Sequence, residues 1–156
     1  MDDRLQGGCA CGKVRYRLLS EPMFVNCCHC RDCQTHTGSA FVINAIIETD
    51  RIETSTTEFE VTKFKSGGGG PHDIYRCPEC HTAVWSDYGR NPGRRFIRVG
   101  TLDSPSELPP GAHVFTRSKL SWVHLPEGVP AFAEYFDIRE HWPAESLERR
   151  RASSPG

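Results

Sequence analysis

The stretch that decides the fold of this chain is I-Y-R-C-P-E-C-H-T-A-V-W, at residues 74–85. Short β-prone runs flank Cys77 and Cys80, an arrangement typical of a zinc ribbon with the metal at the turn of a hairpin. A second close pair, Cys9 and Cys11, lies far upstream beside an alternating, strand-like run. Zinc sites with four thiolate ligands are usually built from two such pairs. We therefore predict that these four cysteines hold a structural zinc, which ties the N-terminal strand to the later hairpin.

The other four of the eight cysteines belong to the cluster C-C-H-C-R-D-C, which begins at Cys27. The spacing lets the sulfurs of Cys28, Cys30 and Cys33 converge on one metal, whereas adjacent side chains such as that of Cys27 tend to diverge. Catalytic zinc is held by three protein ligands with an open fourth position, so we predict a catalytic-type zinc at these three cysteines. The alternative is that Cys27 or His29 fills the fourth position and closes the site.

Composition restricts the functional classes. The chain has 156 residues, of which 37% are hydrophobic and 25% charged, as in a single soluble globular domain. Its net charge of −1 argues against a protein that binds nucleic acid by neutralising phosphates. No apolar run approaches the ~20 residues that span a bilayer, and residues 1–6 lack the apolar segment of a secretory signal. We expect a cytoplasmic protein without nucleic-acid or membrane partners, and in a reducing cytosol close cysteine pairs favour metal or redox roles over disulfides.

The pattern along the chain predicts a mainly β fold with few short helices. Alternating or β-branched runs predict strands at residues 13–18, 40–47, 58–62, 74–76, 83–85, 95–99, 113–115 and 131–136. One short helix is predicted over residues 32–37, because Gly38 can end it. Residues 67–70 are four glycines and predict a flexible loop tip. Residues 143–156 have no core-forming pattern, so we predict a single domain over residues 1–142 followed by a flexible C-terminal tail.

Several motifs along the chain resemble those of one known family. They are G-C-A-C-G-K-V-R-Y at residues 8–16, C-H-C-R-D-C at 28–33, G-S-A-F at 38–41, C-P-E-C at 77–80, Trp85, H-V-F at 113–115, Trp122 and G-V-P-A-F at 128–132. Each motif is weak alone, but in this order and spacing they resemble the glutathione-dependent formaldehyde-activating enzyme (GFA) family, which includes centromere protein V. The resemblance extends from about Gly7 to Phe132.

The resemblance implies a small zinc-binding β fold, the β-tent, with two zinc ions per chain. It places a structural zinc at the positions of Cys9, Cys11, Cys77 and Cys80, and a catalytic-type zinc at those of Cys28, Cys30 and Cys33. The activity that gives the family its name joins glutathione to formaldehyde and is classed, for the reverse direction, as that of a carbon–sulfur lyase. The chain departs from the family pattern at His81, where glycine is common, at the four-glycine loop, and at the extra thiol of Cys27.

The chemistry of the three-thiol cluster suggests the same class of reaction. Zinc held by three thiolates activates water poorly but accepts another thiol, which loses its proton on binding. A metal-bound thiolate can add to a small electrophile such as an aldehyde. The resemblance then implies an S-(hydroxymethyl)glutathione synthase type of carbon–sulfur lyase, which reversibly adds a thiol such as glutathione to a small aldehyde such as formaldehyde. His29 is a candidate acid–base group because the pKa of histidine lies near neutrality, and His36 and Asp32 are similar candidates.

Two other functions are compatible with the same residues. One is a non-enzymatic zinc module that binds a protein partner, with both metal sites structural and the second closed by Cys27. The other is a thiol-redox or metal-buffering role for the pair Cys27–Cys28. His113, in a motif-matching position, is expected to be a buried, hydrogen-bonded histidine.

Overall fold

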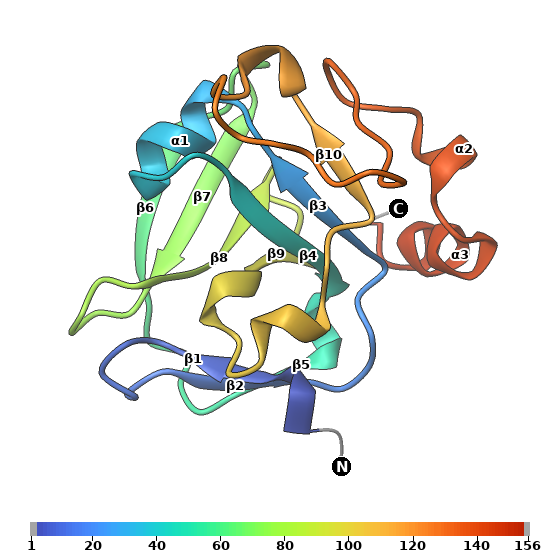
Figure 1. Cartoon of the computed structure of the whole chain (residues 1–156). Helices are drawn as coiled ribbons and strands as arrows, with labels where there is room; N and C mark the ends of the chain where they lie inside the picture. Colours follow the sequence, from blue (N-terminus) through green and yellow to red (C-terminus); the bar gives the residue numbers. More distant parts are fainter. Residues whose placement is uncertain (1–2, 155–156) are drawn as a thin grey trace.

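The computed structural model describes residues 3–154, which form two β-sheets (Figure 1). The smaller sheet contains β1 (Gln6–Gly8), β2 (Arg15–Leu18) and β5 (Ile52–Thr54). The larger sheet has seven strands in the spatial order β10 (Ala112–Val114), β3 (Phe24–Cys28), β4 (Val42–Glu48), β9 (Arg94–Arg98), β8 (Ala83–Tyr88), β7 (Pro71–Arg76) and β6 (Glu60–Lys65). In the described part of the chain, β10 and β3 run parallel, and the other strand pairs are antiparallel.

The helices are short. They are α1 (Arg31–Thr37), α2 (Ile138–His141) and α3 (Ala144–Ala152), with 3-10 turns at Asp3–Leu5, Thr49–Arg51, Val99–Thr101, Pro105–Glu107 and Thr116–Ser118. Helix α1 begins after Cys30, whose sulfur accepts a hydrogen bond from the backbone N–H of Cys33, and ends at Gly38 with a φ of 65°. Glycine adopts this left-handed conformation without steric cost, which is why the helix stops there. None of the helices within residues 3–154 combines the length and hydropathy needed to cross a membrane.

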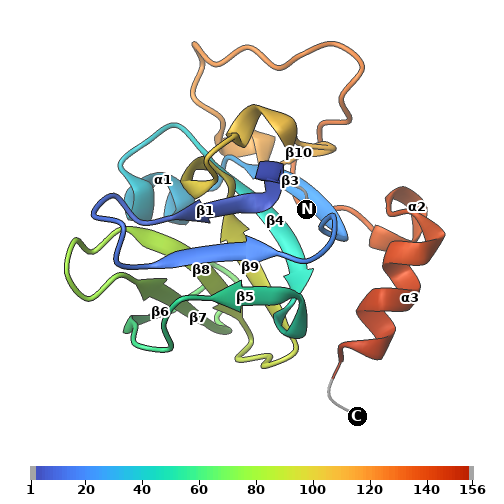
Figure 2. The same ribbon diagram turned by 90° about the horizontal axis from the view of Figure 1, so that it is seen from below.

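The large sheet buries side chains on both faces, and Figure 2 shows the small sheet lying across one of them. On β4, Ala45 and Ile47 join a core cluster that includes Tyr16 of the small sheet. Val42 and Ile46 point the opposite way and join a second cluster, which α1 and the C-terminal segment cover. Because successive strand residues alternate between faces, the central strands β3, β4 and β9 contribute to both clusters. This alternation decides where the cysteines of β3 point.

The prediction of a mainly β fold with few short helices is confirmed, and so is the helix over residues 32–37. Each predicted strand overlaps an observed one, except at residues 131–136. There the chain forms only an isolated bridge to His113. Instead of alternating, Phe132 and Tyr135 both pack on Phe136, with ring centroids 4.9 Å apart in each pair. The aromatic content that suggested a strand therefore builds a local cluster.

The predicted C-terminal tail contains an ordered helix. Helix α3 places the guanidinium of Arg149 against the carboxylate of Glu48 at the end of β4, with Nε–Oε1 and Nη2–Oε2 distances of 2.7 Å. These side chains are only 13% and 8% exposed. Just before the helix, Trp142 stacks on Phe24 of β3 at 5.5 Å. The sequence pattern missed this attachment because one bidentate ion pair, rather than an apolar stripe, fixes the helix.

Replacing Arg149 by methionine should lower the free energy of unfolding by about 2 kcal/mol, because it leaves the buried carboxylate of Glu48 with only the more distant Arg51, whose Nε lies 3.5 Å from Oε1. The matched control is Arg139→Met, which breaks an ion pair with Asp137 that is largely exposed on the Arg139 side and should change stability little. Urea unfolding followed by circular dichroism measures both. Equal effects of the two substitutions would contradict the anchoring role of Arg149.

The same variant has a defined pH dependence. Burial alone would raise the pKa of Glu48, but the hydrogen bonds and charge of Arg149 outweigh it and hold this pKa below its ordinary value. A lowered folded-state pKa gives stability that is complete above the unfolded pKa and is lost as the pH falls through the folded one. The stability difference between wild type and Arg149→Met should therefore narrow below about pH 4.

Candidate metal centres and active-site cavity

Two pairs of cysteines far apart in the sequence meet beside the small sheet. The sulfurs of Cys9, Cys11, Cys77 and Cys80 all lie within 4.8 Å of one another. The Cys9–Cys11 and Cys11–Cys77 sulfur distances are 3.5 and 3.7 Å. Ligand bonds of about 2.3 Å in a tetrahedral zinc site place sulfurs about 3.8 Å apart. The four thiols therefore fit a soft tetrahedral metal. Their convergence is the arrangement that the cysteine spacing predicts.

Donors around this four-thiol cluster suit negatively charged sulfurs. The backbone N–H of Val14 donates to the sulfur of Cys9 at 3.2 Å. The hydroxyl of Thr82 lies 3.2 Å from the sulfur of Cys80. His81 follows with a φ of 60°, the left-handed region that favours glycine. Its Nδ1 lies 2.8 Å from a carboxylate oxygen of Glu60, which anchors the side chain at this strained position. The departure from the family pattern at this position is thus accommodated locally.

The three-thiol cluster forms where β3 leads into α1. Cys28 ends the strand, Cys30 caps the helix and Cys33 lies in its first turn, with all three sulfurs within 4.8 Å of one another. Hydrogen bonds with Cys28 and Cys33 lower the pKa of Cys30, whereas hydrogen bonds with Cys28 and Cys30 raise the pKa of Cys33. The three thiols therefore compete for protons, which a divalent cation would displace. Within residues 3–154, this cluster contains no fourth Cys, His, Asp or Glu ligand.

Cys27 and His29 do not complete this cluster. Both project to the other face of β3, where they lie close to His113 of β10. Strand alternation separates Cys27 from Cys28, so a fourth ligand from Cys27 is not what the geometry favours. Burial raises the pKa of the Cys27 thiol to about 12, and Cys27 and Cys28 are both free thiols. An inaccessible, protonated thiol is a poor redox group.

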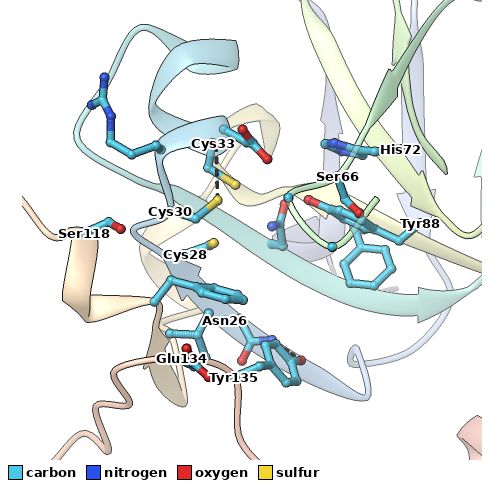
Figure 3. A pocket seen from close by; sticks show the side chains of 18 of the residues that line it. Asn26, Cys28, Cys30, Cys33, Ser66, His72, Tyr88, Ser118, Glu134 and Tyr135 are labelled. Carbon is cyan, nitrogen blue, oxygen red and sulfur yellow. Dashed lines mark hydrogen bonds between the residues drawn. The ribbon is translucent and has the colours of Figure 1, made fainter. Parts of the chain in front are cut away.

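A cavity of about 710 Å³ opens beside the three-thiol cluster (Figure 3). Its aromatic walls are Tyr88, Phe96, Phe115 and Tyr135. Its charged residues are Arg31, Asp32, Arg117 and Glu134, of which Arg117 and Glu134 pair with each other. Ser66, Gly67 and Gly68 add one edge, so the predicted glycine loop borders the cavity. Sites for small molecules usually measure roughly 300–1,000 Å³ and combine apolar walls with a few polar groups.

The structure separates the three candidate acid–base residues by their position relative to the cavity. His29 is fully buried and does not line the cavity, and His36 packs against the ring of Phe64 with centroids 4.1 Å apart. Asp32 does line the cavity. The histidine that lines it is His72 of β7, which stacks on Tyr88 at 4.1 Å.

Figure 3 shows His72 on the side of the cavity opposite the three sulfurs. Its Nε2 is buried and has no hydrogen-bond partner in the described part of the chain. Burial, together with the charges of Arg98 and His36, lowers the pKa of His72 to about 4, so the ring is neutral at pH 7. A neutral ring with a free nitrogen can hold or donate one proton. No sequence motif marked His72, because only the pairing of β7 with β8 brings it here.

The structure thus shows a small β protein with two thiol clusters, one of them beside a cavity. Comparison with known proteins identifies the family to which such a chain belongs. The family model described as "Glutathione-dependent formaldehyde-activating enzyme" matches residues 4–118. A Halomonas elongata protein named "Putative glutathione-dependent formaldehyde-activating enzyme" is 30% identical over 144 residues, covering 85% of this chain and 89% of that protein. The chain therefore belongs to the glutathione-dependent formaldehyde-activating enzyme family.

A solved structure also resembles the chain, though weakly. The crystal structure of a Rhodobacter sphaeroides protein covers 81% of this chain and 98% of its own, with 18% identity and a TM-score of 0.45. A likeness of this size indicates nothing about activity.

The two thiol clusters should respond differently to substitution. Cys77→Ser should remove one zinc and lower the melting temperature by on the order of 10 °C, because its cluster joins segments that are distant in sequence. Cys30→Ser should also remove one zinc but lower the melting temperature less, because its cluster closes only a short loop. Elemental analysis of the purified variants and thermal unfolding check both expectations. Unchanged zinc content in either variant would contradict the corresponding site.

Proposed function

We propose that the protein catalyses the reversible addition of a thiol, glutathione or a close analogue, to a small aldehyde such as formaldehyde. The observation that supports this function is the cavity beside Cys28, Cys30 and Cys33, which gives a small molecule access to those three sulfurs. The family description and the name of the Halomonas elongata relative suggest glutathione and formaldehyde as the reactants. A zinc ion held by the three cysteines would bind the substrate sulfur as a thiolate and lower the pKa of that thiol.

The cavity suits a charged, peptide-like thiol. Arg31 and Arg117 offer guanidinium groups, and Asp32 and Glu134 offer carboxylates, around a space with aromatic walls. Glutathione carries both carboxylate and ammonium groups, so it could pair with either kind of side chain. Arg117 is paired with Glu134 at the edge of the cavity, where both side chains are more than half exposed. These residues would bind and orient the thiol with its sulfur toward the cysteines.

The reaction also needs a place for one proton. A carbon–sulfur bond forms, the carbonyl π electrons move to oxygen, and the proton lost by the thiol ends on that oxygen. His72 is our candidate for holding this proton, because its ring lines the cavity and its Nε2 has no hydrogen-bond partner among residues 3–154; since Nε2 is buried, the ring would have to shift slightly to reach the proton. In the reverse direction, the same nitrogen would accept the hydroxyl proton as the carbon–sulfur bond breaks.

The test of the function is exchange NMR with glutathione and formaldehyde. The wild-type protein should accelerate exchange between free glutathione and its hydroxymethyl adduct above the spontaneous rate, and Cys30→Ser should return exchange to that rate. Thr35→Ala, on the exposed outer surface of α1, is the matched control and should retain full activity. Failure of the wild type, loaded with zinc, to accelerate exchange with any of several small thiols would favour the alternative of a non-enzymatic zinc module.

His72→Phe should lower kcat by on the order of 10²-fold, with little change in KM or zinc content, because it removes a proton-holding group and keeps the ring packed on Tyr88. His72→Gln keeps a hydrogen-bond donor and should retain more activity than His72→Phe. The measurement is the rate of exchange as a function of glutathione concentration. A loss confined to KM would instead assign His72 to thiol binding.

A further inference from the structure

We propose that Cys27, His29 and His113 form a third metal site, suited to zinc and separate from both thiol clusters. Cys27 and His113 are direct partners in the parallel pairing of β3 with β10, which lie side by side in Figure 1. His29 follows Cys27 by two residues, so its side chain returns to the same face. All three side chains are buried, with exposures of 1%, 0% and 6%.

The distances in this trio match those expected around zinc. The Cys27 sulfur lies 3.6 Å from Nε2 of His29, and that nitrogen lies 3.0 Å from Nδ1 of His113. The three ligand atoms all lie within 4.8 Å of one another. Tetrahedral zinc with its usual ligand bonds would separate sulfur from nitrogen by about 3.6 Å and two nitrogens by about 3.3 Å. One thiolate with two imidazoles is also a donor set that zinc favours.

Hydrogen bonding alone does not satisfy this trio. One ring nitrogen must donate to the other across the 3.0 Å contact, while Nδ1 of His29 and Nε2 of His113 are buried without a partner. In either arrangement of the protons, one neutral ring keeps a buried N–H that donates to nothing. Metal binding would leave both outer nitrogens protonated, but the free energy of binding a structural zinc exceeds the cost of one more unpaired N–H.

The position of the trio indicates a structural role. It faces away from the cavity and has no route by which a substrate thiol could reach it. It lies between β3 and the three-residue strand β10, whose following segment supplies Phe115, Arg117 and Ser118 to the cavity. A strand this short gains few ladder hydrogen bonds. A metal shared by the two strands would fix β10, and with it one wall of the cavity.

The decisive measurement is zinc stoichiometry on the full chain. Purified wild type, dialysed after saturation with zinc, should hold three ions per chain, and Cys27→Ala and His113→Ala should each hold two. Val25→Ala is the matched control, since it truncates a buried side chain on the same strand and face and should keep three. Wild type with two ions, unchanged in Cys27→Ala, would overturn the proposal.

Cobalt substitution keeps the test decisive if a variant is unstable. In the wild type, the third equivalent of Co²⁺ should add absorption typical of tetrahedral cobalt with one thiolate and two imidazoles. Saturation after two equivalents, both with thiolate-rich spectra, would show a metal-free hydrogen-bonded trio. Neither readout uses catalysis, so the third site and the proposed activity can fail independently.

Discussion

The alternation of side chains at the end of β3 is the constraint on which the rest of the site depends. It sends Cys28 to the face that carries the cavity and Cys27 to the face that carries His113. Because consecutive residues of an extended strand cannot point the same way, two adjacent thiols serve two separate clusters. Helix α1 then begins at once and returns Cys30 and Cys33 to the cavity side. The adjacent cysteines Cys27 and Cys28, which resemble a redox pair in the sequence, therefore lie on opposite faces of the sheet.

The two thiol clusters differ in what they connect. The four-thiol cluster joins the turn after β1 to the turn between β7 and β8, so it links the small sheet to the large one. The three-thiol cluster lies within one short stretch of chain and does not connect segments that are distant in sequence. Its geometry is therefore not needed to join the two sheets. Both clusters have backbone donors at their sulfurs, but it is the three-thiol cluster that borders the cavity. Position in the fold therefore separates a structural cluster from a candidate catalytic one.

Much of this could be predicted from the sequence, because cysteine spacing and strand alternation are local signals. The grouping of Cys9 and Cys11 with Cys77 and Cys80 is an example. Strand β3 was missed because F-V-N-C-C is buried at four of its five positions and shows no polar alternation. His72 was missed because its role depends on which strand pairs beside it. The C-terminal helix was missed because it depends on an ion pair between residues about a hundred positions apart.

The match to the family ends at residue 118, yet Glu134 and Tyr135 still line the cavity. The three sulfurs of the cluster therefore lie within the part that the family model matches, while part of the cavity wall is contributed by residues beyond it. That segment is irregular and is held by aromatic packing together with backbone hydrogen bonds to β10, such as that from the Phe132 N–H to the His113 carbonyl at 2.9 Å. It carries none of the seven cysteines of the two thiol clusters. If the proposed activity holds, changes in this segment would alter which thiol the cavity accepts and leave the three sulfurs of the cluster in place.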